Sequence, residues 1–259
     1  MEKGQGLGQE QRQGQERGQE QGQEQGQEQG QEQGQEQGQG QKQGKSKRPR
    51  PGPGTVQGQK QEQWEERVQL QDKAFRFGFV LGRFQHVHVG HELMIDTALQ
   101  VCGKVLVLVG SAQLEGTLRN PYSAEVRMEL LHRLYGDRIE LAMLPDYSHE
   151  NDHSHAWGSY LLKAVRGCGR ERGFAELDLM IYGSDEERVA WFAKEELNGV
   201  AQLALPRDRQ PISATRLRES LVRDDRVLWK QHVNEALHCE YDRLRALLLQ
   251  IPEYQVQVK

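Results

Sequence analysis

Ten consecutive residues, Gly82 to His91, combine side chains that can hold phosphate groups. They read GRFQHVHVGH, follow an apolar run at 75–81 that predicts a strand, and lead into a helix predicted at 89–101. The first exposed amides of a helix and its positive dipole end attract anions. His88 and His91 are three residues apart, so both rings can address one point, and Gly90 between them would let a phosphate approach the backbone. The segment therefore predicts an anion site, with Arg83 alongside.

Two other interpretations of the histidine pair compete with a phosphate site. Histidines at the start of a helix can be ordinary surface residues. Zinc sites use three or four protein ligands, and here no set of Cys or Glu ligands accompanies the pair. We therefore predict no bound metal at this segment.

A second candidate anion site begins at Ile212, in the segment ISATRLR. Ser213 is a good N-cap for a helix, and Thr215 and Arg218 fall within the first two turns. This predicts another helix N-terminus that can face an anion. The alternative is that Ser213 only caps the helix and Arg218 is a solvated surface charge.

The elements that must bring these two segments together alternate between strand and helix. Apolar runs predict further strands at 105–109, 139–144, 177–182 and 200–205, and helical spacing predicts helices from Ser123, at 157–165 and at 185–197. Such alternation favours an α/β fold, a Rossmann-like doubly wound parallel sheet of about five strands. Ligands bind such sheets at the carboxyl ends of the strands, where the loops after Leu81, Val109, Leu144 and Tyr182 would open.

Composition divides the 259 residues into three parts. Residues 1–72 are mostly a Gln, Gly and Glu repeat with few apolar side chains, which predicts a disordered low-complexity tail. Residues 73–223 form the predicted α/β domain that carries both candidate anion sites, and 224–259 continue the same domain as a helical C-terminal cap.

Charge and cysteine content restrict the partners and the compartment. A formal net charge of -4 gives no general affinity for nucleic acid or an acidic membrane. No stretch approaches the roughly 20 apolar residues that span a bilayer, and Met1 is followed by polar repeat rather than an apolar signal core. The three cysteines lack paired spacing, which favours a reducing compartment. We expect a soluble cytoplasmic protein, with the nucleus as an alternative because of a basic cluster at Lys45, Lys47, Arg48 and Arg50.

The two motifs together resemble a known family. The pattern G-R-F-Q-x-x-H-x-G-H early in the fold and I-S-x-T-x-x-R late in it is similar to the H-x-G-H nucleotidyltransferase superfamily. Within it, the sequence resembles the nicotinamide-nucleotide adenylyltransferases, both the archaeal type and the transferase half of the bacterial bifunctional enzymes. Gly110 to Gln113 and Arg119 to Ser123 add to this resemblance.

The resemblance implies a reaction and a set of roles. The reaction joins nicotinamide mononucleotide (NMN) to ATP, giving NAD and pyrophosphate with Mg²⁺. By resemblance, His88, His91, Arg83 and Arg218 would be catalytic, stabilising charge on the departing pyrophosphate. The residues expected to bind ATP are Gly82, Phe84, Gly90, Gly183, Ser213 and Thr215, and those expected to bind NMN are Arg119, Trp157, Ser111 and Asn151.

Two departures from the family pattern and two alternative functions accompany this expectation. The family usually has Pro where this chain has His86, and the segment between Asn151 and Trp157 is longer than usual.

One alternative function is that of a relative that uses another acceptor, such as flavin mononucleotide, phosphopantetheine or a phosphorylated alcohol. The other is a non-catalytic nucleotide-binding scaffold that recruits partners through its repetitive tail. Similar enzymes commonly assemble into oligomers, so a homo-oligomer is expected by resemblance.

Overall fold

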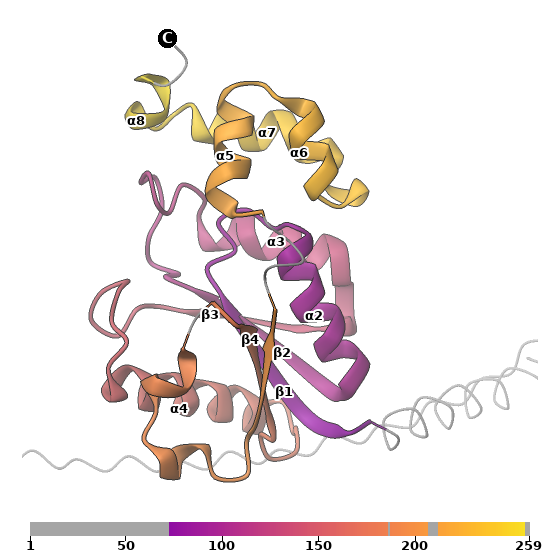
Figure 1. Ribbon diagram of the computed structural model, residues 1–259, viewed down its shortest axis with the longest axis vertical. Helices are drawn as coiled ribbons and strands as arrows, with labels where there is room; N and C mark the ends of the chain where they lie inside the picture. The colour runs from indigo at the N-terminus through magenta and orange to yellow at the C-terminus, as the bar shows by residue number, and fades with distance from the viewer. Residues whose placement is uncertain (1–72, 186, 207–211, 257–259) are drawn as a thin grey trace, which may run out of the picture. The chain divides into compact units, whose positions relative to one another are not determined.

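A computed structural model describes residues 73–185, 187–206 and 212–256 (Figure 1). The predicted tail at 1–72, with its basic cluster, lies outside the described residues. The strands are β1 (Phe75–Gly82), β2 (Cys102–Gly110), β3 (Glu140–Leu144), β4 (Leu179–Gly183) and β5 (Ala201–Leu205). The α-helices are α2 (Val89–Val101), α3 (Ala124–Tyr135), α4 (His155–Glu171), α5 (Ala214–Val222), α6 (Arg226–His232), α7 (Tyr241–Leu248) and α8 (Pro252–Gln255). In this part of the chain, none of the helices has the length and apolarity that a membrane span requires.

The five strands form one parallel sheet in the order β3-β2-β1-β4-β5. β1 and β4 are neighbours although two strands separate them in sequence, so the direction of winding reverses between them. That reversal is the topological switch point where open parallel sheets bind ligands. The predicted Rossmann-like α/β fold is confirmed.

Alternating side chains of the strands build a core on each face of the sheet. Val80 of β1 and Val107 of β2 belong to the cluster that α2, α3 and the C-terminal helices cover. Phe79 and Leu108 point to the other face and pack with α4. Figure 1 shows α4 on the opposite side of the sheet from α2 and α3. Because both faces are buried, the strands read as continuous apolar runs in the sequence.

One predicted helix is wrong. The segment 185–197 forms two short 3-10 helices, Arg188–Trp191 and Lys194–Leu197, with extended backbone at Phe192. Phe192 and Leu197 are both buried in the core beneath α4. Residues five apart in a continuous α-helix lie about 140° apart around its axis, so an unbroken helix could not turn both into that core. Residue 186 lies outside the described residues.

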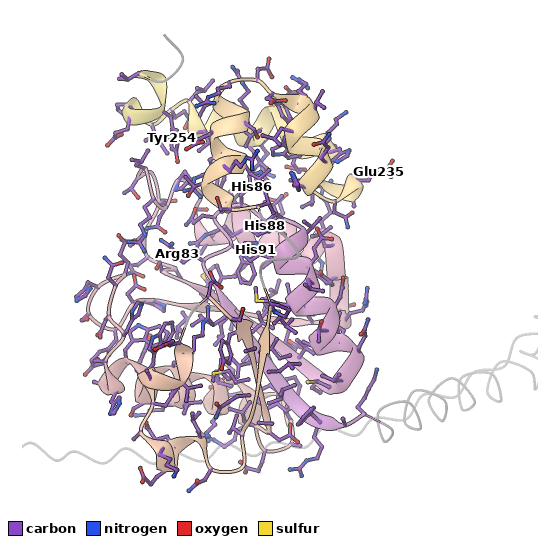
Figure 2. The ribbon with its side chains drawn as sticks, in the orientation of Figure 1. Arg83, His86, His88, His91, Glu235 and Tyr254 are labelled. Atoms are coloured by element: carbon purple, nitrogen blue, oxygen red, sulfur yellow. The ribbon has the colours of Figure 1, made fainter. Side chains whose placement is uncertain are left out.

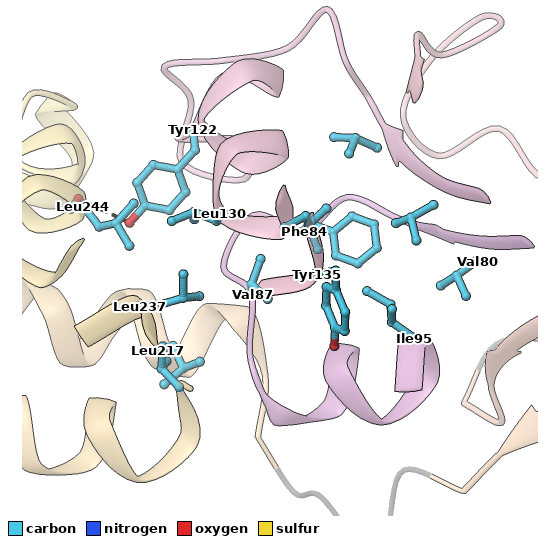
Figure 3. Close-up of a cluster of buried hydrophobic side chains, with 14 of the residues drawn as sticks. Val80, Phe84, Val87, Ile95, Tyr122, Leu130, Tyr135, Leu217, Leu237 and Leu244 are labelled. Carbon is cyan, nitrogen blue, oxygen red and sulfur yellow. Dashed lines mark hydrogen bonds between the residues drawn. The ribbon is translucent and has the colours of Figure 1, made fainter. Parts of the chain in front are cut away.

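The C-terminal helices share the core of the sheet face that α2 and α3 cover. Trp229, Leu237 and Leu244 are fully buried and belong to the same cluster as Phe84 and Val87 of the first motif. Figure 3 shows Leu237 and Leu244 on the side of the cluster that faces Val87 and Phe84. The Tyr122 hydroxyl donates to the carbonyl oxygen of Leu244 at 3.3 Å. Burial of large apolar side chains therefore holds the C-terminal helices against the first-motif loop.

His86 adds a polar contact to this apolar junction. Its Nε2 accepts a hydrogen bond from the indole N–H of Trp229 at 2.7 Å, and its Nδ1 lies 2.8 Å from the carbonyl oxygen of Val87. Since Nε2 accepts, Nδ1 carries the proton and donates to Val87. Burial lowers the pKa of His86 to about 4; the Val87 bond opposes this shift and the charge of Arg218 adds to it. His86 is therefore neutral at physiological pH and bonded at both nitrogens.

Two glycines of α4 should respond in opposite directions to replacement by Ala. A β-carbon on Gly158 would lie 2.0 Å from the carbonyl oxygen of Trp191, whereas one on Gly167 would meet nothing within 4 Å. We expect Gly158→Ala to lower the free energy of unfolding by about 3 kcal/mol through overpacking. Gly167→Ala should raise it by about 0.5–1 kcal/mol, because Ala loses less backbone entropy in a helix. Urea unfolding measures both, and a stabilising Gly158→Ala would contradict the packing.

The lowered pKa of His86 predicts a pH dependence of stability. The unfolded chain binds a proton at His86 near pH 6.5 and the folded chain only near pH 4, so its contribution is complete above pH 6.5. As the pH falls from 6.5 to 4, the free energy of unfolding should decrease by about 3 kcal/mol from this group. Urea unfolding of the wild type and His86→Gln across this range isolates the difference. Parallel curves for the two proteins would show that His86 does not titrate this way.

Candidate active site

A cavity of about 650 Å³ lies at the carboxyl ends of the strands. Gly82, which ends β1, and Gly183, which ends β4, both contribute to its wall, so it lies at the switch point of the sheet. Of the residues predicted for the site, it is lined by Gly82, Arg83, Phe84, His88, His91, Ser111, Arg119, Trp157, Gly183, Ser213, Thr215 and Arg218. Gly90 and Asn151 are not part of its lining.

His88 is the N-cap of α2, with extended backbone at φ -152° and ψ 168°. Its Nδ1 accepts a hydrogen bond from the amide of Gly90 at 3.0 Å, so a neutral His88 carries its proton on Nε2 as a donor. A β-carbon on residue 90 would lie 3.0 Å from Cε1 of His88. The His88 ring therefore lies beside Gly90, and the expectation that Gly90 lets a phosphate approach the backbone stays a prediction.

His91 lies one turn further along α2, beside His88. The centroids of the two rings are 4.0 Å apart, so the pair addresses one region, as the spacing predicted. The ring of Phe84 packs against His91 at 4.9 Å between centroids. Phe84 has left-handed backbone at φ 50°, and a β-carbon on Gly82 would lie 2.9 Å from its ring. Any side chain at Gly82 would therefore press on the Phe84 ring, which packs against His91.

A second helix N-terminus faces the same cavity. Ser213 caps α5 by accepting the amide of Arg216 at 3.2 Å, and Ser213, Thr215 and Arg218 all line the cavity wall. Arg218 is buried; its Nη2 donates to Thr215 Oγ1 at 3.2 Å and its Nε to the hydroxyl of Tyr254 at 2.9 Å. The two motifs, over 120 residues apart in sequence, therefore converge. Figure 2 shows the histidines between the sheet and the C-terminal helices.

Elsewhere in the cavity wall, the carboxylate of Glu150 contacts both Arg83 and Arg119. Its carboxylate lies 3.7 Å from Nη1 of Arg83 and 3.4 Å from Nη1 of Arg119, and it accepts a hydrogen bond from the side-chain Nδ2 of Asn120 at 2.7 Å. Asn151 accepts from Arg119 at 2.6 Å, so any influence of Asn151 on the cavity passes through that arginine. A phosphate bound here would compete with Glu150 for the same two guanidinium groups.

Aromatic rings form a third part of the wall. Trp157 is 7% exposed and meets Trp191 edge to face at 5.2 Å between centroids. His153 stacks on Trp191 at 4.6 Å with the ring planes 10° apart. All three residues line the cavity, so it offers flat surfaces to a planar group. Trp191 was not predicted as a site residue, because it lay within a predicted helix.

Arg127 supports the cavity from beneath and was not among the predicted site residues. Its fully buried guanidinium donates to the carbonyl oxygens of Arg83 and Gly110 at 2.8 Å each, and of Ser111 at 3.3 Å. Burial lowers its pKa to about 10, so it stays charged at neutral pH. A lone Arg among the apolar positions of α3 was the available signal in the sequence.

Arg188 also binds a main-chain carbonyl oxygen, in this case one of β1. Its guanidinium donates to the carbonyl oxygen of Leu81 at 3.0 Å and lies 5.3 Å from the ring centroid of Trp191. Because Arg188 also lines the cavity, it adds positive charge at the end of β1. Its position within the incorrectly predicted helix concealed this role.

The cavity combines positive and negative side chains. Arg83, Arg119, Arg188 and Arg218 face Asp146, Glu150, Asp152 and Asp185 around it. Hydrogen bonds from Ser148 and Ser154 lower the pKa of Asp152 to about 2, so it is ionised at neutral pH. Within the described ranges, His, Cys, Asp and Glu form no cluster of three that could hold a metal ion. The arrangement can bind a polyanion between two helix N-termini and hold a second anionic group beside Arg119.

Comparison with known proteins agrees with this geometry. The family model of the cytidylyltransferase-like proteins matches residues 79–220, which contain both motifs. The nicotinamide-nucleotide adenylyltransferase of Thermococcus sibiricus is 28% identical over 167 residues, covering 62% of this chain and 80% of that protein. The enzyme of the same name from Thermococcus kodakarensis is 30% identical over 152 residues, covering 56% of this chain and 72% of the relative.

The fold is also found among solved structures. A bifunctional NMN adenylyltransferase/ADP ribose pyrophosphatase from Francisella tularensis, crystallised with AMP and manganese, superposes with a TM-score of 0.52 at 22% identity. The match covers 71% of this chain and 52% of that one. This likeness concerns the fold, whereas the sequence matches concern the family. The chain is an enzyme of the cytidylyltransferase-like family and belongs with its nicotinamide-nucleotide adenylyltransferases.

Proposed function

We propose that this enzyme transfers the adenylyl group of ATP to NMN, giving NAD and pyrophosphate. The observation that carries the proposal is the convergence of His88, His91 and Arg218 on one cavity between the N-termini of α2 and α5. The names of the Thermococcus relatives support the choice of acceptor. The Francisella protein, of the same fold, binds AMP in its crystal structure, which supports a nucleotide as the donor.

The reaction requires positioning and charge neutralisation more than a strong base. An oxygen of the NMN phosphate attacks the α-phosphorus of ATP; the new P–O bond forms as the bond to the β-phosphate oxygen breaks, and pyrophosphate leaves with that electron pair. The attacking oxygen is already anionic at neutral pH. We assign stabilisation of the departing pyrophosphate to His88, His91, Arg83 and Arg218, whose donors line the cavity.

The two substrates are proposed to occupy different parts of the cavity. ATP would bind along Gly82, Phe84, Gly183, Ser213 and Thr215, with Gly90 supporting His88. NMN would place its phosphate near Arg119 and Ser111 and its ring near Trp157, with Asn151 orienting Arg119. Mg²⁺ is proposed to enter as the counter-ion of ATP and to neutralise part of its charge. The triphosphate would supply oxygen ligands for the ion, as substrate phosphates do for Mg²⁺ in many enzymes.

Cellular location and assembly stay predictions. Cys102, Cys168 and Cys239 are free thiols in the structure, which suits a reducing compartment, the cytoplasm or alternatively the nucleus. A homo-oligomer is expected only because similar enzymes commonly assemble into oligomers.

Removing one imidazole should separate catalysis from folding. We expect His91→Ala to reduce kcat for NAD formation by about 100-fold to 1,000-fold, because the ring donates to charge that develops only during transfer. His132→Ala is the matched control, since His132 is exposed on α3 and does not line the cavity. Coupled assay of NAD measures turnover, and thermal melting checks the fold of each variant. If His91→Ala and His132→Ala had equal turnover, His91 would have no catalytic role.

The identity of the acceptor is tested by product formation. With Mg²⁺ and ATP, we expect NMN to release pyrophosphate and yield NAD, because Arg119 and the aromatic wall suit a phosphate that carries a flat ring. Flavin mononucleotide, phosphopantetheine and a phosphorylated alcohol should each give less than about a hundredth of that rate, since they leave contacts in the pocket unpaired. Chromatographic detection of the adenylylated product decides the matter. If the enzyme adenylylates another of these acceptors and not NMN, the proposal is wrong, and the chain catalyses the same kind of transfer to that acceptor.

A further inference from the structure

Tyr254 of α8 joins two parts of the cavity wall that are far apart in sequence. Its hydroxyl accepts a hydrogen bond from Nε of Arg218 at 2.9 Å and donates one to the carbonyl oxygen of Leu118 at 2.7 Å. Arg218 belongs to the α5 side of the cavity, and Leu118 directly precedes Arg119. Figure 2 labels Tyr254, which extends from α8 toward that loop. One oxygen atom therefore connects the proposed ATP and NMN sides.

The two hydrogen bonds fix the orientation of the Tyr254 hydroxyl. The hydroxyl hydrogen is directed to Leu118, so a lone pair of the same oxygen is directed to Arg218. Tyr254 is only 3% exposed, so solvent has little access to either bond. In Tyr254→Phe, both the Nε–H of Arg218 and the carbonyl of Leu118 would lose a partner in a buried setting.

The contact also fixes the direction of the Arg218 guanidinium. Nε is bonded to Tyr254 and Nη2 to Thr215 on the preceding turn of α5. A planar group held at two of its three nitrogens can no longer rotate about its last torsions. Nη1 is then the part of the guanidinium available to a phosphate in the cavity that Arg218 lines.

We propose that Tyr254 is a positioning residue of the active site, whose hydroxyl sets Arg218 toward the phosphates of ATP and holds the loop that carries Arg119. It acts through these residues and does not itself line the cavity. The family match ends at residue 220, so this contribution comes from a part of the chain beyond the matched region. The identity of both ligands, ATP beside Arg218 and NMN beside Arg119, rests on the proposed function, whereas the two contacts of Tyr254 do not depend on it.

The test compares two Tyr→Phe variants. Tyr254→Phe should weaken binding of a non-hydrolysable ATP analogue about tenfold in titration calorimetry and lower kcat/KM for NAD formation about 10-fold to 100-fold, because small misplacements of a catalytic group are costly. Tyr241→Phe is the matched control. It also loses one hydroxyl hydrogen bond among the C-terminal helices, a part-buried bond of 2.8 Å to Asp224, but Tyr241 does not line the cavity. Its affinity and turnover should stay within twofold of the wild type.

A double-variant comparison separates positioning from a general loss of stability. In an Arg218→Lys background, adding Tyr254→Phe should change the affinity for the ATP analogue by less than twofold, since the group it orients is gone. Independent effects of the two substitutions would overturn the proposal, as would a Tyr254→Phe enzyme that matches Tyr241→Phe in affinity and turnover. If the wild type binds the analogue but makes no NAD from NMN, the proposed function fails while the binding comparison still decides the role of Tyr254.

Discussion

The buried guanidinium of Arg127 is the interaction on which the cavity depends. It donates to the carbonyl oxygens of Arg83 and Gly110, which directly precede Phe84 and Ser111, two of the three non-glycine residues with left-handed backbone in the described part of the chain. Left-handed backbone at a non-glycine residue costs on the order of 1–3 kcal/mol and persists only where its surroundings over-determine it. Arg127 supplies that constraint to the first two loops at once, and these loops carry Phe84 and Ser111 into the cavity wall.

The same contact also shapes the electrostatics of the site. A parallel sheet presents carbonyl oxygens at the carboxyl ends of its strands, and these would repel phosphates. Arg127 binds such oxygens after β1 and β2, and Arg188 binds that of Leu81. With those oxygens covered, the amides at the N-termini of α2 and α5 can attract an anion from two directions. The fold thereby converts an edge rich in acceptors into one that receives a polyanion.

Features governed by local chemistry could be predicted from the sequence. Helix α2 matches its predicted bounds, because His88 caps it and apolar residues recur at helical spacing behind the cap. Strand β2 was recognised but begins earlier than predicted, at Cys102, where pairing with Phe75 extends a stretch that is not apolar. The convergence of Ser213 and Arg218 on the histidines followed from the shared edge of a parallel sheet.

Features set by distant contacts could not be predicted. The break at Phe192 depends on two side chains reaching one core, so helical periodicity alone could not reveal that Arg188 and Trp191 line the cavity. Arg127 bonds to the loop after β1, to the last residue of β2 and to the N-cap of its own helix, and no local pattern specifies which carbonyls it meets. The sequence likewise does not show that the His88 ring lies beside Gly90.

The C-terminal helices belong to the site through polar bonds that cross an apolar junction. Apolar packing is not directional, so the cluster around Leu237 and Leu244 would tolerate small shifts of these helices. Hydrogen bonds impose direction, and a buried one that is broken leaves unpaired groups. The Trp229 bond to His86 ties the helices to the loop that carries His88, and Tyr254 ties them to Arg218. Movement of these helices would therefore change the relation between the imidazoles and the guanidinium, on which the proposed chemistry depends.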